Sequence, residues 1–200
     1  MLPLDTALAL VSFAFATSIT PGPNNIMLTA SGVNFGFVRT IPHMIGIGVG
    51  FMALLAAVGL GIGAVFAAAP ELQVVLKVVG AAYILWLAWK VANAGGVGDA
   101  ADLRSRPMTF WEAAGFQWVN PKAWVMAIGA MSVFVRPDHA AVDIATVTLI
   151  FGLVNVPSVG TWAAFGHALR NVLRDPAKVR IFNVAMALLL VASTLPIVTG

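Results

Sequence analysis

The chain has no cysteine, and only 10% of its 200 residues are charged. The absence of cysteine excludes disulfides, thiolate metal sites and thiol redox chemistry. The three histidines, His43, His139 and His167, lie far apart in sequence, so a metal centre is not expected either. The sequence therefore predicts a protein that works without a metal and without a cofactor.

Apolar residues take the place of charge and make up 60% of the chain. Soluble domains are about 45–50% apolar and about 25% charged. No soluble fold of this length could bury so much apolar surface, so the surplus is expected to face lipid. The net charge is +3, and the basic residues lie in short segments between apolar stretches. This pattern indicates membrane orientation and argues against a nucleic-acid partner.

The first apolar run ends in Ala14-Phe15-Ala16, which resembles a signal-peptide cleavage site. The segment before it contains Asp5 and no Lys or Arg, whereas a signal peptide begins with basic residues. The apolar run also resumes beyond Pro21. We therefore expect a first transmembrane helix here and not a cleaved signal.

Six stretches have roughly the 20 mainly apolar residues that a membrane-spanning helix needs. They lie at residues 4–33, 41–69, 72–91, 108–135, 142–169 and 179–198, and the first is interrupted. The segment 93–106 between the third and fourth stretches is glycine-rich and charged. The sequence thus predicts an all-α integral membrane protein that forms a single transmembrane domain over residues 1–200.

Lys and Arg divide unequally between the two sides of the predicted membrane. The odd-numbered loops and their flanks hold eight of them, and the even-numbered ones hold two. Because cytoplasmic loops carry the excess of basic residues, the odd loops and the linker 93–106 are predicted to be cytoplasmic, with both termini outside. The eight are Arg39, Lys90, Arg104, Arg106, Arg170, Arg174, Lys178 and Arg180, and the two are Lys77 and Arg136.

The six predicted spans divide into two sets of three, at about residues 1–95 and 107–200. The first span of each set is broken by proline beside a polar cluster, and the two clusters lie about a hundred residues apart. Three is an odd number, so the second set must insert upside down relative to the first. The sequence predicts two inverted three-helix repeats, an arrangement typical of secondary transporters. The clusters are Pro21-Gly22-Pro23-Asn24-Asn25 and Asn120-Pro121-Lys122.

Each break is predicted to open a half-helix that faces the interior of the protein. Asn120 is a good N-cap with Pro121 at the first helical position, and Asn24 or Gly22 could act likewise in the first repeat. Free N–H groups and the positive end of a helix dipole would suit an anionic group such as an amino-acid carboxylate. Ordinary proline kinks are the alternative. Two breaks in corresponding spans, each beside Asn, favour a substrate-binding or gating site.

Lys122 lies near the middle of the span 108–135, where a basic residue costs roughly 2.5–3.5 kcal/mol on insertion scales. About 20 Å of helix on either side is too far for the side chain to reach the membrane surface. We therefore expect Lys122 to face a cavity, close to Asn24 or Asn25. Asn155 and Pro157 interrupt the fifth span and either contribute polar ligands or mark a simple kink.

Glycines in the second span recur with a spacing that lets helices approach closely, at Gly46/Gly50 and Gly59/Gly63. Packing within the chain is the favoured interpretation, and a homodimer is the alternative. No phosphate-binding glycine loop is present, so active transport would draw on an ion gradient, with protons as the expected coupling ion.

The segment Thr20-Pro21-Gly22-Pro23-Asn24-Asn25, followed by Gly36-x-x-Arg39, resembles the signature of the LysE-type translocators. The segment Phe116-Gln117-Trp118-Val119-Asn120-Pro121-Lys122 resembles the Asn-Pro-Lys motif of the same family. The resemblance implies export of amino acids across the bacterial inner membrane, driven by the proton gradient. Family members that resemble exporters of lysine and arginine tend to carry an acidic residue in the second span. Residues 44–60 have none, which favours a neutral amino acid or derivative.

Two functions are alternatives to export: a membrane scaffold and a membrane-embedded enzyme. A membrane scaffold or accessory subunit that does not itself transport would have no need of a costly cation at Lys122. A membrane-embedded enzyme would need acid, base or nucleophile pairs at membrane depth, and none is visible at useful spacing. We therefore predict a transporter, not an enzyme.

The loop charges predict the topology. Reporter fusions at Asp99 and Arg174 should read cytoplasmic, and fusions at Asp138 and at the C-terminus should read external, because Lys and Arg are retained in the cytoplasm. A cytoplasmic reading at the C-terminus would overturn this orientation.

Overall fold

The computed structural model describes residues 3–94, 106–173 and 175–195, and these residues are almost entirely helical, with no strand among them. α1 spans Leu4–Ile19, α2 spans Pro23–Phe35, and α3 spans Phe37–Ala57. A π-helical turn, Val58–Ile62, leads into α4, Gly63–Ala68. The remaining helices are α5 (Pro70–Ala92), α6 (Phe110–Phe116), α7 (Pro121–Phe134), α8 (Ala140–Val172) and α9 (Pro176–Ala192).

The helix starts follow the local sequence signals. Thr109 and Glu112 form a reciprocal capping box at α6, and Asp175 caps α9 by accepting from the Ala177 N–H. Pro occupies the first helical position of α2, α5, α7 and α9, where its missing N–H costs nothing. Pro70 begins α5 in this way.

Two of the predicted spans are each divided into two helices. α1 and α2 are separated by Thr20, Pro21 and Gly22 and meet at a bend of 56°. α6 and α7 are separated by residues 117–120. The break at Pro21 and Pro23 has a direct cause, since neither residue can donate an N–H to the preceding turn.

The fifth predicted span is not interrupted, contrary to one expectation. α8 runs unbroken for 33 residues through Asn155 and Pro157. One proline removes a single helical hydrogen bond, and the chain accommodates this loss within the helix, as it also does at Pro42 in α3.

Three helical stretches among the described residues are long and apolar enough to cross a membrane, and the bent pair of α1 and α2 would be a fourth. The three are Phe37–Val65, Val74–Ala92 and Pro137–Val172. α7 and α9 are shorter, with 14 and 17 residues. The molecule is therefore an all-helical protein with three to four candidate spans, and the six-span arrangement in two inverted repeats stays a prediction.

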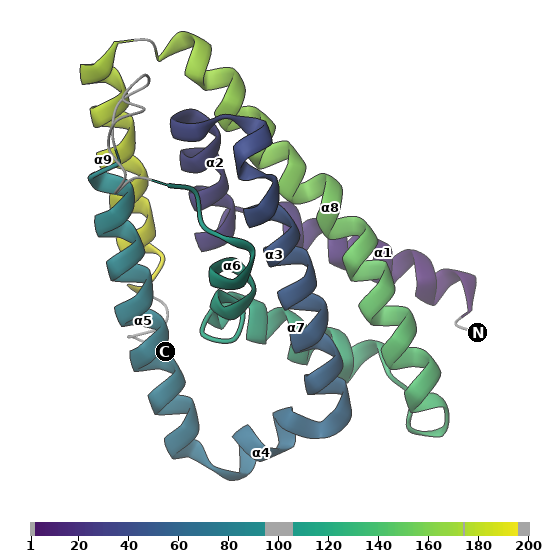
Figure 1. Ribbon diagram of the computed structural model, residues 1–200. Coiled ribbons are helices and arrows are strands. Elements are labelled where there is room, and N and C mark those ends of the chain that lie inside the picture. Colours follow the sequence, from purple (N-terminus) through teal and green to yellow (C-terminus); the bar gives the residue numbers. More distant parts are fainter. Residues whose placement is uncertain (1–2, 95–105, 174, 196–200) are drawn as a thin grey trace.

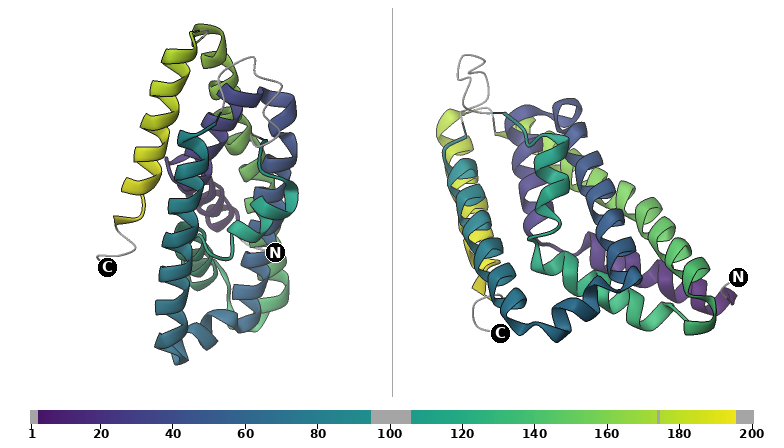
Figure 2. Two further views of the ribbon diagram at one scale, coloured as in Figure 1. Left: turned by 60° about the vertical axis from the view of Figure 1, so that its left-hand side comes forward. Right: turned by 60° about the horizontal axis from the view of Figure 1, so that its bottom comes forward.

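The helices form two groups in space. α5 and α9 run side by side along one edge of the molecule, while α8 slants along the opposite edge against α1, α2 and α3 (Figure 1, Figure 2). One apolar core joins α1, α3, α7 and α8 around Phe51 and Phe151, and a second joins α2 with α5, α6 and α9 around Phe116. Large apolar side chains such as Val38, Leu60 and Leu153 remain exposed, which suits a surface that faces lipid.

Glycine allows the closest helix approaches. A Cβ on Gly46 would collide with the carbonyl oxygen of Phe110 and lie 2.8 Å from the Cβ of Ala113, so α3 packs against α6 through bare backbone. Gly50 contacts Ala114 in the same way. The Gly46/Gly50 spacing is thus used within the chain, as favoured above, and a homodimer stays a prediction.

This packing predicts opposite effects for two neighbouring glycines. Gly46→Ala should destabilise the protein by about 1–3 kcal/mol, because the new methyl group has no room against α6. Gly48→Ala is the matched control on the same helix, since its Cβ would meet only the Asn155 amide oxygen at 3.8 Å. It should be neutral or stabilising, because Ala favours the helix. Unfolding midpoints of the purified variants would test this, and equal losses at both positions would contradict the packing.

Candidate functional site

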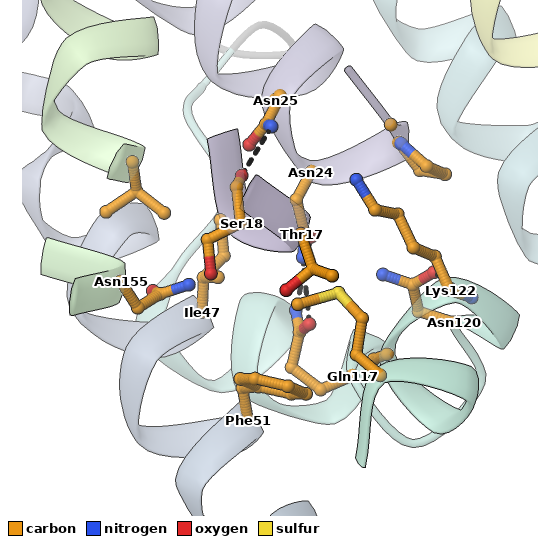
Figure 3. Close-up of a pocket in the computed structure, with 15 residues that line it drawn as sticks. Thr17, Ser18, Asn24, Asn25, Ile47, Phe51, Gln117, Asn120, Lys122 and Asn155 are labelled. Atoms are coloured by element: carbon orange, nitrogen blue, oxygen red, sulfur yellow. Dashed lines mark hydrogen bonds between the residues drawn. The ribbon is translucent and has the colours of Figure 1, made fainter. Parts of the chain in front are cut away.

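A small cavity lies where the two broken spans meet (Figure 3). Its volume is about 30 Å³, and one water position needs about 10–15 Å³, so the cavity has room for about two waters. α1, α2, α3, α7, α8 and the turn between α6 and α7 all contribute to it. The lining residues are Thr17, Ser18, Gly22, Pro23, Asn24, Asn25, Ile47, Phe51, Gln117, Asn120, Lys122, Ala123, Met126, Asn155 and Val159.

Lys122 joins the second broken span to the first. Its Nζ donates to the carbonyl oxygen of Thr20 at 2.6 Å and to that of Pro21 at 3.5 Å. These carbonyls follow the C-terminal end of α1, where a cation is favoured by the helix dipole. The positive side chain therefore satisfies backbone that the break leaves without helical partners.

Gly22 gives the Lys122 side chain room to reach these carbonyls. A Cβ on Gly22 would lie 2.8 Å from Cδ and 3.1 Å from Nζ of Lys122. Any larger residue at this position would push the lysine aside. The glycine between the two prolines thus leaves room for the observed position of a side chain 100 positions away.

A second link between the breaks is a reciprocal pair of amides. Asn24 Nδ2 donates to Gln117 Oε1 at 2.8 Å, and Gln117 Nε2 donates to Asn24 Oδ1 at 3.2 Å. Gln117 Nε2 also donates to the Ala113 carbonyl at 2.9 Å. Gln117 is fully buried. We had not predicted it as a site residue, although a glutamine inside an apolar span beside Asn120-Pro121 was a usable signal.

The other two asparagines at the breaks hold the backbone in place. Asn25 Nδ2 donates to the carbonyl oxygens of Ser18 at 3.0 Å and Thr20 at 2.9 Å. Asn120 caps α7, because its Oδ1 accepts the Lys122 N–H at 3.2 Å. The expectation of free N–H groups at both half-helices is therefore wrong for α7. It fits α2, whose N-cap Gly22 has no side chain to offer.

The structure brings most of the predicted site residues together. Gly22, Pro23, Asn24, Asn25, Asn120, Lys122 and Asn155 all line the cavity. Pro21 and Pro121 do not line it; they shape the backbone on either side. Lys122 shares the cavity with both breaks, as expected from its cost in the membrane. A role of these residues in binding a substrate stays a prediction.

Two polar residues of α1 were missed by the sequence reasoning. Thr17 and Ser18 line the cavity from the last turn of α1 (Figure 3). They interrupt an apolar run directly before Pro21, which is the signal that could have identified them.

A larger cavity of about 310 Å³ lies between α2, α3, α5 and the residues that flank the 95–105 segment. His43 lines it and is buried. None of the predicted site residues borders this second cavity.

Comparison with known proteins gives a consistent result. The family model described as LysE type translocator matches residues 15–199. A cysteine/O-acetylserine efflux protein of Salmonella typhimurium (strain LT2) is 35% identical over 184 residues, which cover 90% of this chain and 91% of that protein. The protein of the same name from Escherichia coli (strain K12) is 33% identical, with the same coverage. No solved structure was found to match the chain.

Proposed function

Because the chain belongs to the LysE-type translocator family, whose members are transporters and not enzymes, we propose that it exports small neutral amino acids or their derivatives across the bacterial inner membrane. Export of amino acids by a multi-pass membrane protein is what the family and the efflux relatives support directly. The restriction to neutral substrates, the coupling to protons and the external termini are our proposals.

The observation that carries the proposal is the charge of the central cavity. Among the described residues that line it, Lys122 is the one charged residue, and Asp and Glu are absent. An amino-acid carboxylate that loses its water on leaving the cytoplasm could bind to the Lys122 ammonium and to the uncapped N-terminus of α2. A cationic side chain would find no carboxylate to pair with, and an unpaired charge is costly to bury.

The names of the relatives fit this charge pattern. Cysteine and O-acetylserine, which appear in the names of the efflux relatives, are neutral amino acids with small side chains. A cavity with one cation, several amides and the apolar walls of Ile47, Phe51 and Met126 suits substrates of this kind.

Substrate binding must also open the site. A cavity of about 30 Å³ holds about two waters and is too small for an amino acid. We propose that the substrate carboxylate competes with the Thr20 carbonyl for Nζ of Lys122. When Lys122 leaves Thr20, the connection that holds the two breaks together is weakened, and the half-helices are free to move apart. The Lys122 ammonium group would then take part both in substrate binding and in the conformational change.

The two breaks suit a pair of inverted repeats. Pro23 and Pro121 each occupy the first position of the second half-helix, so Asn24 and Lys122 hold equivalent places. We propose that this equivalence reflects the inverted repeat expected from the sequence. A half-helix from each repeat would then meet near the middle of the membrane.

Removal of the Lys122 charge should reduce export without impairing insertion into the membrane. Lys122→Met should insert at least as well as the parent, because a charge within the membrane is costly. Export should fall at least about tenfold, since a charge-assisted hydrogen bond is worth about 1.5–3 kcal/mol. Lys122→Arg should also be impaired, because the larger planar head needs a different geometry.

The measurement is efflux of labelled neutral amino acids from cells or vesicles with matched protein amounts. Lys77→Met is the control, because Lys77 is exposed on α5 and is not among the residues that line the cavity. Normal export by Lys122→Met would show that Lys122 has no part in the cycle.

Proton coupling makes a separate prediction. It rests on the absence of a nucleotide-binding motif in the sequence. Efflux should collapse when a protonophore dissipates the proton gradient while ATP is held constant. Efflux that persists would identify a facilitator or a different coupling ion.

A further inference from the structure

Two buried polar atoms at the central cavity have no hydrogen-bond partner. They are the Ser18 hydroxyl oxygen and the Asn155 amide oxygen Oδ1, and each residue is only 6% exposed. Both residues line the cavity that also holds Lys122. A buried polar group without a partner destabilises the protein, so two residues with unpaired oxygens on the lining of one cavity suit a ligand that brings donors. The Asn155 oxygen lies near Gly48 of α3 and must turn to meet such a ligand.

Among the described residues, Ser18 and Thr148 carry buried hydroxyls without a partner, and of these two Ser18 is the one that lines the central cavity. Thr17, its neighbour, donates back to the Phe13 carbonyl at 2.7 Å. Ser158 donates to the Val154 carbonyl at 3.0 Å, and Thr161 donates to the Pro157 carbonyl at 2.8 Å. Such bonds to the preceding turn are the common solution for Ser and Thr within helices. Ser18 lacks this bond, and its hydroxyl is left for a group in the cavity.

Asn155 lies on the other side of the cavity from Lys122. In Figure 3 the Asn155 side chain extends from α8 toward Ser18, while Lys122 approaches from α7 on the opposite side of the view. The Asn155 amide nitrogen points inward in this view. A half-turn about the terminal torsion, which has a soft energy profile, exchanges it for the oxygen.

We propose that Ser18 and Asn155 form the subsite that binds the α-ammonium group of the substrate, opposite a carboxylate subsite at Lys122 and the N-terminus of α2. The proposal rests on the proposed function, which supplies an amino acid as the ligand. An ammonium group has three donors and no acceptor, so it needs oxygen acceptors such as a hydroxyl and an amide. The two subsites would fix the direction of the zwitterion across the cavity.

The neutrality of this subsite has a consequence for selectivity. The two acceptors are uncharged and do not neutralise a cation. They therefore suit an amino acid whose ammonium charge is already balanced by its own carboxylate. Ile47, Phe51 and Val159 are apolar walls of the cavity, and no lining residue that the structure describes is an Asp or Glu that could pair with a second cationic group. A carboxylate whose amino group is blocked would leave both acceptors unpaired and should bind poorly.

Two isomers test the subsite. O-acetyl-L-serine and N-acetyl-L-serine have the same atoms, but the amino group is free only in the first. Each would compete with labelled cysteine for uptake into inside-out vesicles that contain the protein. Assays run under reducing conditions and below neutral pH, where the acetyl group does not migrate. The parent protein should prefer O-acetylserine by at least about tenfold, the effect of one hydrogen bond to a charged group.

Ser18→Ala and Asn155→Leu should each bring the two isomers closer to equal competition. Each substitution should weaken the binding of O-acetylserine about tenfold and leave the binding of N-acetylserine little changed. The two residues lie on different helices, so the test survives if one variant fails to fold. Ser158→Ala is the control, because it removes a buried hydroxyl that is already bonded within α8. It should keep the preference of the parent.

The outcomes distinguish a failure of the proposed function from a failure of the ammonium subsite. A parent protein that transports no compound of a labelled panel of small neutral amino acids, with cysteine and O-acetylserine among them, would contradict the proposed function itself. A parent that transports cysteine but treats the two isomers alike would contradict the ammonium subsite alone. Folded Ser18→Ala and Asn155→Leu variants that keep the full preference would show that the ammonium group binds elsewhere.

Discussion

The structure depends on one constraint: backbone groups freed by a helix break inside a membrane must find partners within the protein. At the first break, Asn25 and Lys122 share the carbonyl oxygen of Thr20, at 2.9 Å and 2.6 Å. At the second, Asn120 caps the helix that follows. The Asn24–Gln117 pair then ties the two breaks together. The polar side chains of this region are therefore where the broken backbone requires them.

The same constraint explains why a cavity with polar walls, our candidate binding site, arises here. The side chains that bond to the broken backbone bring amides and a cation into an apolar interior, where they line the central cavity. Lys122 satisfies the first break in this conformation and, in our proposal, the substrate carboxylate during transport. A group that serves both roles links occupancy of the site to the geometry of the half-helices. The Ser18 hydroxyl and the Asn155 amide oxygen have no partner in the protein, and in our proposal they bind the ammonium group of the substrate.

Much of this site could be predicted from the sequence, because its signals are local. Pro21-Gly22-Pro23 stops a helix, Asn120-Pro121 starts one, and a lysine far from either membrane surface must face a cavity. Gln117 was missed because its partner is distant in sequence: it bonds to a residue 93 positions away. Ser18 was missed because the cavity that it lines forms only when α1 packs against distant helices. Pro157 was misleading for the opposite reason, since a lone proline costs one hydrogen bond, which α8 tolerates without breaking.

The central claim is that one ammonium group, that of Lys122, holds the breaks together in this conformation and binds the carboxylate of the substrate during transport. The most direct measurement is an experimental structure of the protein with a bound neutral amino acid. The account predicts that the substrate carboxylate lies within hydrogen-bond distance of Lys122 Nζ and that the bond from Nζ to the Thr20 carbonyl is lost. An amino acid bound elsewhere, with Lys122 still on the Thr20 carbonyl, would contradict it.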